Sequence, residues 1–486
     1  MKEIKTETLI IGAGPAGLSC AMELSKADKD FIVVEKDSMP GGLSKTYVFK
    51  EDDGSVFYTD NGPHRFFSKN KNLYDFIENL ISEDWIKVKR QTRQYIDGVF
   101  YDYPVNAFQA LRNIGFLGSI KMGADYFFAK IKYGLFKRPI NTFQDYAYAN
   151  FGKSLADFNI VNYTEKIWGI PSDQIHPDWA IQRIKGLNLL SVFMGAFRKI
   201  LSIKNDGPKS LVEEFFYPSK GTGLIYETIV KKIESKGYTV YFETEPVKID
   251  FLKNGEILVW LKNKKGEELK IICTNLVESI PITNFVKLIE PKPETEIIEA
   301  VSKLRHRNQV YLFVTLNKES ITGDQWIYFP SKETSIARVS EMRNFSKFMS
   351  PEGKTSLFVE FFCFEGDSVW NSSKEELLEE VLRVMGGVFF DKKDIRETYV
   401  IRQKNVYPVY DMNYLTYLDK VKNYLNEYKN LFYIGRPGRF RYNNQDHSLE
   451  MGMLTAKSII DSKKYDIESV GQEKEYYEEG KLFSKK

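Results

Sequence analysis

The stretch TLIIGAGPAGLSCAMELSKADKDFIVVEK, residues 8–36, decides the fold. It begins with a short apolar run, Thr8 to Ile11, which predicts a buried strand. Pro15 to Lys26 has the composition of a helix, and Phe31 to Glu35 predicts a second strand. A strand, a helix and a strand in so short a span form a βαβ unit with parallel pairing. We therefore expect an α/β fold whose first sheet is parallel near the N-terminus.

The glycines between the first strand and the helix indicate a dinucleotide site. Gly12, Gly14 and Gly17 form the pattern G-x-G-x-x-G. They permit a tight turn, a close approach of the backbone to a pyrophosphate, and close packing of helix on strand. The free N–H groups at the helix N-terminus attract that anion. Glu35, the acid at the end of the second strand, suits the ribose hydroxyls. The other expected contacts of this unit are Pro15, Ala16 and Lys36.

NAD and FAD both use such a unit, and the next segments favour FAD. Gly41-Gly42-Leu43 and the residues up to Thr46 resemble the GG-x-x-x-T signature of FAD proteins in the amine oxidase and glutathione reductase-like superfamily. Two consecutive glycines leave a bare backbone beside the cofactor chain. The resemblance implies that Val247 lies against the adenine. It also makes residues 430–435 a second FAD-contacting segment, with Gly435 and Arg436 at its end.

Length and composition fit an ordinary globular protein. The chain has 486 residues, 43% of them hydrophobic and 28% charged, which suggests two or three domains. The net charge of +3 gives no reason to expect nucleic-acid binding. Three scattered cysteines and four histidines show neither a disulfide framework nor metal-ligand spacing. We expect a cytoplasmic protein without a metal, without a signal peptide and without a transmembrane segment, and a homodimer is one option for its assembly. The apolar segment 114–136 is interpreted as an amphipathic helix that covers the protein's own core, with contact to a membrane as the less favoured alternative.

The expected fold is a Rossmann-like, glutathione reductase-like FAD-binding domain that is interleaved with other regions. Helices are predicted at 72–82, 107–136, most of 141–205, 374–385 and 448–460. Alternating runs at 238–242, 247–251, 257–261 and 269–273 predict a half-exposed antiparallel sheet. The expected divisions are a FAD-binding domain from residues 1–100, 206–285 and 400–465, a helical substrate or lid region at 101–205, a sheet-rich substrate domain at 286–399, and a charged tail at 466–486. The chain is expected to be loosely attached from Asp461 onward.

Two further segments resemble UDP-galactopyranose mutases of the same superfamily. Residues 60–66, with Gly62, Pro63 and His64, resemble the G-P-H-x-F segment that brings a histidine close to the flavin. Residues 162–169 resemble the Y-T-E-K-x-W segment, which implies that Tyr163 and Trp168 contact the base of a nucleotide sugar. A flat aromatic partner suits a base. The alternative for both rings is a helical aromatic pair that fills the core.

The phosphate-binding residues come from the same resemblance. Arg183 and Arg338 fall near arginines of the mutases, and a guanidinium forks onto phosphate oxygens. Tyr407 and Tyr442 correspond to paired tyrosines on the substrate phosphates. Asn444 stands where the mutases carry an aspartate, and Asp446 is a possible replacement for that charge. The helix that follows should point its N-terminus, with Ser448 and Met451, at the flavin.

Two functions follow from the resemblance. The first is a FAD-dependent mutase that interconverts pyranose and furanose nucleotide sugars for cell-surface polysaccharide. In that family the N5 atom of the reduced flavin attacks the anomeric carbon, with no net redox change. His64, Arg338, Tyr407 and Tyr442 would be its catalytic residues. The alternative is an oxidase or dehydrogenase of the protoporphyrinogen oxidase, amine oxidase or desaturase type.

Overall fold

The computed structural model describes residues 2–68, 70–103, 107–180 and 214–471, with the backbone alone at 107–112, 114 and 116. The predicted βαβ unit is present in full. β1 (Lys2–Ile11) pairs in parallel with β2 (Phe31–Val34), and α1 (Pro15–Lys26) connects them. Leu9, Ile10 and Ile11 are almost completely buried, so this strand lies in the centre of the sheet.

The first sheet extends on both sides of this unit. Its order is β13-β10-β11-β12-β1-β2-β9, and β19 also pairs with β12. The remaining strands are β9 (Thr239–Tyr241), β10 (Thr244–Phe251), β11 (Ile257–Asn263), β12 (Glu268–Glu278), β13 (Ile289–Glu290) and β19 (Leu431–Tyr433). The expected antiparallel set is correct for β10, β11 and β12. It is wrong for the run at 238–242, because β9 pairs in parallel with β2 at the opposite edge of the same sheet.

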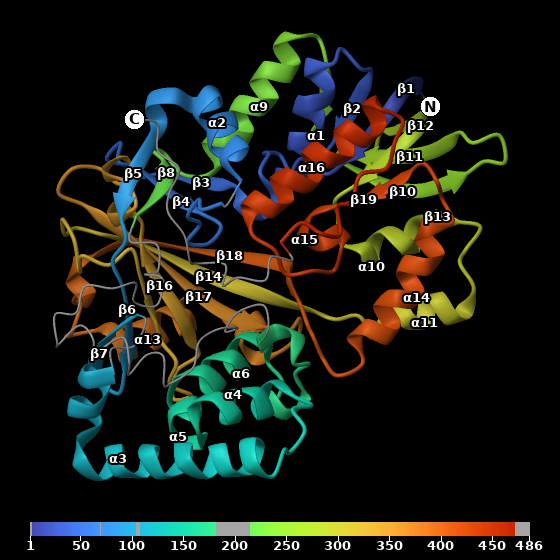
Figure 1. The fold of residues 1–486 in the computed structure, drawn as a ribbon. Coiled ribbons are helices and arrows are strands. Elements are labelled where there is room, and N and C mark those ends of the chain that lie inside the picture. Colours follow the sequence, from blue (N-terminus) through green and yellow to red (C-terminus); the bar gives the residue numbers. More distant parts are fainter. Residues whose placement is uncertain (1, 69, 104–106, 181–213, 472–486) are drawn as a thin grey trace.

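Two helices from opposite ends of the chain pack against each other beside this sheet (Figure 1). They are α1 and α16 (Gln445–Ile460). The hydroxyl of Ser19 donates to the carbonyl of Leu449 at 2.9 Å. A Cβ on Gly452 would lie 2.1 Å from the carbonyl oxygen of Ala16, so only glycine fits at this crossing. The helix begins at Gln445 and not at Ser448 as predicted, because Asn444 takes the N-cap position.

The second sheet is mostly antiparallel and has the order β18-β14-β17-β16-β15-β6-β7. Its strands are β6 (Thr92–Ile96), β7 (Val99–Asp102), β14 (His306–Leu316), β15 (Trp326–Tyr328), β16 (Ile336–Glu341), β17 (Thr355–Cys363) and β18 (Ile395–Pro408). The expected domain boundaries therefore differ from the sheets: residues 92–102 and all of β18 lie in this second sheet. Helix α13 (Lys374–Met385), which has the predicted bounds, covers one face and begins at a capping box of Ser373 and Glu376.

Smaller elements connect the two sheets. They are β3 (Thr46–Lys50), β4 (Val56–Asp60), α2 (Lys71–Ile81), β5 (Trp85–Lys89), α4 (Phe143–Phe151), α5 (Lys153–Leu155), α6 (Asn162–Trp168), β8 (Glu214–Pro218), α9 (Gly223–Ser235), α10 (Ile282–Phe285), α11 (Thr295–Lys303), α12 (Ser368–Asn371), α14 (Tyr414–Asn426) and α15 (Gly435–Gly438). The hairpin β3–β4 and the pair β5–β8 lie outside both main sheets.

The helix predicted over 107–136 is present but does not cover the core. It comprises α3 (Ala107–Ala129), which is interrupted at Gly115, and a π-helical turn, η3 (Lys130–Leu135). Phe127 and Phe128 are 62% and 65% exposed. The interpretation of this segment as a helix covering the protein's own core is therefore wrong for the side chains that the structure describes.

The first part of the charged tail is packed against the protein, which corrects the expectation of a loose attachment. Val470 is buried beside α1 and α16. Glu468 forms ion pairs with Lys422 and Arg439, and its carbonyl accepts from Arg441 at 2.9 Å. These contacts hold the chain to α14 and to the loop after α15. Residues 472–486 lie outside the described part.

Candidate active site

The glycine turn after β1 has the geometry that its sequence predicts. The carboxylate of Glu35 accepts from the backbone N–H of Ala13 at 2.7 Å, and burial raises the pKa of this carboxyl group. A Cβ on Gly17 would lie 2.0 Å from the carbonyl oxygen of Gly12. Helix and turn thus touch through bare backbone, and the first N–H groups of α1 have no side-chain cap. This arrangement suits an anion at the helix N-terminus.

Gly41 and Gly42 lie against the glycine turn that follows β1. The N–H of Gly41 donates to the carbonyl of Ala13 at 2.8 Å. Gly41 has a φ of +106°, a conformation that side chains disfavour. A Cβ on Gly42 would lie 3.2 Å from the Cα of Gly14. The two segments therefore form one continuous cradle of backbone.

This cradle opens into a cavity of about 1100 Å³ that extends from the first sheet to the second. The volume exceeds the roughly 300–1,000 Å³ of an ordinary small-molecule pocket, so it can hold a large cofactor with a second ligand beside it. The predicted residues that line it are Gly12, Gly14, Pro15, Ala16, Glu35, Lys36, Gly42, Leu43, Gly62, Pro63, His64, Arg338, Tyr407, Gly435, Arg436, Tyr442, Asn444 and Ser448.

Other predicted residues do not line this cavity. Gly17 and Gly41 support the cradle from behind. Val247 lies at an irregularity of β10 and is 45% exposed, and the wall there comes from Glu243 and Glu245. Val247 is not among the lining residues, and the contact of its backbone with the adenine stays a prediction. Met451 is buried in the core beside Asn443, and Asp446, the possible replacement for the charge at Asn444, lies in the first turn of α16 outside the lining. Arg183 lies outside the described residues.

Several polar atoms on the cavity wall fit a cofactor with hydrogen-bonding edges. Within the described residues, both side-chain polar atoms of Asn61, Nδ1 of His64 and Oε1 of Gln445 are buried without a hydrogen-bond partner. Buried polar groups are normally paired, so these atoms require a ligand that donates and accepts. The glycine cradle takes a pyrophosphate, and the acid Glu35 suits a ribose. These residues fit FAD.

The far end of the cavity contains a buried ion pair. The guanidinium of Arg338, on β16, forms two hydrogen bonds with the carboxylate of Glu360 on β17, one of them at 2.9 Å. Glu360 is 1% exposed and also accepts from Gln309 at 3.1 Å, which in turn accepts from Tyr311 at 2.6 Å. Burial alone would lower the pKa of Arg338, but Glu360 raises it well above its ordinary range. The arginine is held rigidly and stays charged.

Glu360 was missed from the sequence although a signal was present. It is the one charged residue in TSLFVEFFC, residues 355–363, whose nine members are all buried. A lone carboxylate in such a strand needs a partner. Trp326, Tyr328 and Arg65 also line the cavity and were not predicted as site residues.

Two tyrosines form a stacked wall beside the cradle. The rings of Tyr407, at the end of β18, and Tyr442, in the loop before α16, lie 5.5 Å apart and 12° from parallel. The guanidinium of Arg436 lies 5.1 Å and 4.9 Å from their ring centres. It donates to the carbonyl of Asn443 at 2.6 and 2.9 Å and is therefore fixed in place. The wall presents hydroxyl groups and one positive charge.

Trp168 lies in the core and is not part of the cavity lining. It is fully buried in the core, 5.6 Å from Tyr410 and 4.7 Å from Trp179. The core alternative is correct for this residue. Tyr163 also lies outside the cavity lining, and its ring packs edge-on against Tyr328, which does line it.

Lys166, in the same segment as Tyr163 and Trp168, joins two elements of the structure. The ammonium group of Lys166 donates to the carbonyls of Phe329, Ser331 and Ile336 at 2.6–2.8 Å. Burial lowers its pKa to about 7. The lysine thus fastens α6 to the connection between β15 and β16, and so supports the strand that carries Arg338.

His64 remains neutral in this site. Burial, and then the charges of Arg436 and Arg338, lower its pKa to about 3. In the unfolded chain its pKa is about 6.5, so below that pH the unfolded state takes up a proton that the folded state refuses. We expect the free energy of unfolding to fall as the pH drops from about 6.5 toward 3, by at most about 1.4 kcal/mol per pH unit from this residue.

Urea unfolding of wild type and of His64→Asn across this pH range measures that contribution. The pH dependence should be shallower in the variant, and the proton resonances of the His64 ring should not shift between pH 5 and 8. Equal slopes for the two proteins would contradict a buried neutral histidine.

Comparisons with known proteins agree with this geometry. The sequence pattern of the flavin containing amine oxidoreductases matches residues 15–435. The chain therefore belongs to the flavin containing amine oxidoreductase family. It is a flavin-dependent enzyme with a FAD-type cofactor and a Rossmann-like cofactor fold, as predicted from the glycine turn.

Solved structures share the fold over nearly the whole chain. A reduced UDP-galactopyranose mutase has a TM-score of 0.79 at 21% identity and covers 99% of each chain. A protein described as a protoporphyrinogen oxidase, from an Exiguobacterium species, has a TM-score of 0.70 at 16% identity, over 95% of this chain and 99% of its own. Putrescine oxidase bound to putrescine has a TM-score of 0.61 at 13% identity, over 94% of this chain and 100% of its own.

One sequence relative is similar over a short stretch. The 15-cis-phytoene desaturase of Synechococcus elongatus is 39% identical over 80 residues, which is 16% of each chain. Because the match spans about a sixth of the desaturase, it carries no argument about a shared substrate. In the described residues, no helix is long and apolar enough to cross a membrane.

Proposed function

We propose that the protein is a FAD-dependent nucleotide-sugar mutase that interconverts pyranose and furanose rings in the synthesis of cell-surface polysaccharide. The observation that carries the proposal is the wall formed by Tyr407, Tyr442 and Arg436, which faces the same cavity as Arg338 and the glycine cradle. Hydroxyl groups and fixed guanidinium groups suit a diphosphate. The likeness of the fold to that of the reduced UDP-galactopyranose mutase also supports this proposal.

We assign a role to each cavity-lining residue from its chemistry. Tyr407, Tyr442 and Arg436 would hold the diphosphate, and Arg338 would add a second fixed charge that Glu360 orients. His64 stays neutral, so it can accept or donate a hydrogen bond at the reacting centre. A reduced flavin supplies a nucleophilic nitrogen when it is bound. Because Asn444 lacks the charge of the mutase aspartate, the sugar or its position differs from that of galactopyranose mutases.

The second candidate is a net oxidase, which the family and the oxidase-like folds support. Stacked tyrosines could also form an aromatic cage for an amine. The charges argue against a protonated amine at this end of the cavity, since the guanidinium groups of Arg65, Arg338 and Arg436 line it together with the carboxylate of Glu360, which is bonded to Arg338. Like charges in a confined site cost free energy. An uncharged substrate for oxidation remains compatible with this wall.

The assay that separates the candidates uses the dithionite-reduced holoenzyme with UDP- and dTDP-hexopyranoses. We expect a change in product ring size, measured by chromatography and NMR, without net reduction of the sugar. If no sugar nucleotide binds or changes the flavin spectrum, the mutase proposal is wrong. Oxygen consumption with a hydrophobic substrate would then support the oxidase.

Tyr407→Phe tests the wall without disturbing its packing. Removing a hydroxyl that binds a charged phosphate costs about 1.5–3 kcal/mol, so we expect sugar-nucleotide binding to weaken by about ten- to a hundredfold. Tyr465→Phe is a matched control, because its hydroxyl bonds Asp461 far along α16 and does not line the cavity. Titration of the reduced enzyme, followed by flavin absorbance, measures both. Equal affinities for the two variants would exclude Tyr407 from phosphate binding.

A further inference from the structure

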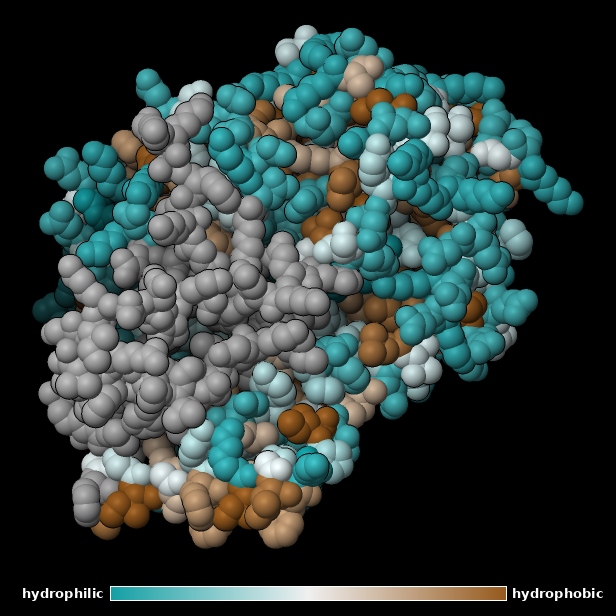
Figure 2. Space-filling model, viewed as in Figure 1, coloured by the Kyte–Doolittle hydropathy of each residue, from teal (hydrophilic) through white to brown (hydrophobic). Residues whose placement is uncertain are grey.

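One helix of the protein exposes its apolar side and keeps its polar side inward. The exposed large apolar side chains on α3, on η3 and at the residue that follows η3 are Leu117 (81%), Ile120 (54%), Phe127 (62%), Phe128 (65%), Leu135 (73%) and Phe136 (74%). We refer to these six as the α3 apolar face. Four of the six, at 117, 120, 127 and 128, recur together with Ala124 at the spacing of one helix face. Figure 2 shows the corresponding hydrophobic surface along the lower edge of the molecule.

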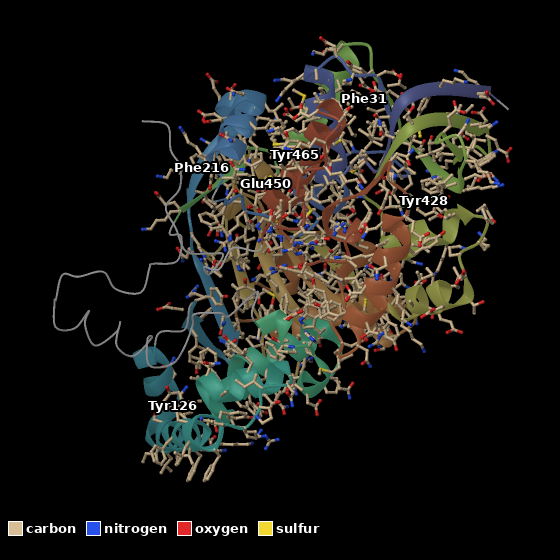
Figure 3. The ribbon with its side chains drawn as sticks, turned by 45° about the vertical axis from the view of Figure 1, so that its right-hand side comes forward. Phe31, Tyr126, Phe216, Tyr428, Glu450 and Tyr465 are labelled. Atoms are coloured by element: carbon tan, nitrogen blue, oxygen red, sulfur yellow. The ribbon has the colours of Figure 1, made fainter. Side chains whose placement is uncertain are left out.

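The opposite side of the same helix is fastened by polar contacts. The carboxylate of Asp125 accepts from the N–H of Ser154 at 3.1 Å and from its hydroxyl. Lys130 donates to the carbonyl of Ala149 at 2.9 Å, and the hydroxyl of Tyr133 donates to Asp145 at 2.9 Å. An ordinary surface helix turns its apolar side chains toward the protein and its polar side chains toward solvent. In Figure 3 the side chains of the helix that carries Tyr126 project away from the protein.

Basic residues flank the α3 apolar face. Residues 117–140 contain five basic side chains and one acid, Asp125, which bonds Ser154 and so does not offset the outward charge. Lys121, Lys132, Lys137 and Arg138 are all exposed. Large aromatic and aliphatic side chains among lysines are the composition of a helix that lies in a membrane interface.

We propose that the α3 apolar face docks on the surface of an anionic phospholipid bilayer, with its phenylalanines among the acyl chains and its lysines at the headgroups. Charge decides between lipid and a second copy of the chain. A two-fold pair would bring the same patch onto itself, and so would oppose the basic residues with each other. An anionic membrane offers the complementary charge, and each Lys or Arg near such a surface adds to the binding.

The experiment uses the FAD-loaded full chain and sedimented vesicles. One set is an equimolar mixture of phosphatidylglycerol and phosphatidylcholine, and the other is phosphatidylcholine alone. We expect binding to the mixed vesicles, at least about tenfold weaker binding to phosphatidylcholine, and a further decline with added salt. Phe127→Ser/Phe128→Ser should weaken binding to the mixed vesicles by about tenfold or more. Lys132→Glu/Lys137→Glu should have a similar effect.

Phe348→Ser is the matched control, because this ring is 50% exposed and lies on a different element, after β16. It should bind vesicles as the wild type does, and the flavin spectrum should be unchanged in every variant. The proposal is overturned if the wild type does not bind mixed vesicles, or if the phenylalanine pair and Phe348 behave alike. It is also overturned if Phe127→Ser/Phe128→Ser instead dissociates a dimer in gel filtration, which would assign the face to a second copy.

Discussion

Arg338→Ala is expected to lower the free energy of unfolding by about 3–5 kcal/mol, because it leaves the carboxylate of Glu360 buried without its partner. Glu360 is 1% exposed, and the two hydrogen bonds from Arg338 are its strongest contacts. Urea unfolding followed by tryptophan fluorescence measures the loss. Under the proposed function, binding of a sugar nucleotide should weaken by about 2–5 kcal/mol as well.

A double variant separates stability from binding. Arg338→Leu/Glu360→Leu replaces the pair with apolar side chains of similar length, and such replacements are often neutral or stabilising. We expect the double variant to regain most of the stability lost in Arg338→Ala, while sugar-nucleotide binding stays weak. A stability loss below about 1 kcal/mol in the single variant would show that the pair is solvated.

Gly17→Ala is expected to release the cofactor. Its Cβ would lie 2.0 Å from the carbonyl oxygen of Gly12, so the turn or the helix must shift. Forced overpacking costs about 1–3 kcal/mol, which corresponds to roughly tenfold or more in FAD affinity. The ratio of flavin to protein absorbance in the purified variant measures the occupancy.

Gly123→Ala is the matched substitution, because nothing lies within 4 Å of its added Cβ. Alanine is a better helix former than glycine, so this variant should keep its FAD and be as stable as the wild type or more so. Full occupancy of both variants would contradict the close contact of turn and helix.

The cofactor end of the site could be predicted from the sequence because its chemistry is local. Gly12, Gly14 and Gly42 act through backbone geometry and Glu35 through its carboxylate. All four belong to one continuous βαβ segment and the turn after it, and the structure brings them to one cavity. The bounds of α1 were also predicted, since Pro15 at its start and the charged residues after Lys26 mark its ends.

The substrate end depends on which strands become neighbours, and sequence periodicity does not contain that information. Arg338 meets Glu360 only because β16 pairs with β17. Trp168 was expected at a ligand, but its neighbours in space, Trp179 and Tyr410, enclose it in the core. The segment 114–136 has a helical period, but the period does not tell which face points outward.

The crossing of α1 and α16 has a consequence for how the chain is made. The helix that begins at Pro15 rests on one that ends at Ile460, and β1 needs β12, residues 268–278, as its neighbour. On a ribosome the N-terminal helix must therefore wait for almost all of the polypeptide before its packing is complete. The strands of residues 306–408 pair largely among themselves and can assemble earlier. We expect the half that holds the cofactor to be the last to consolidate during synthesis, although its strand, turn and helix emerge first.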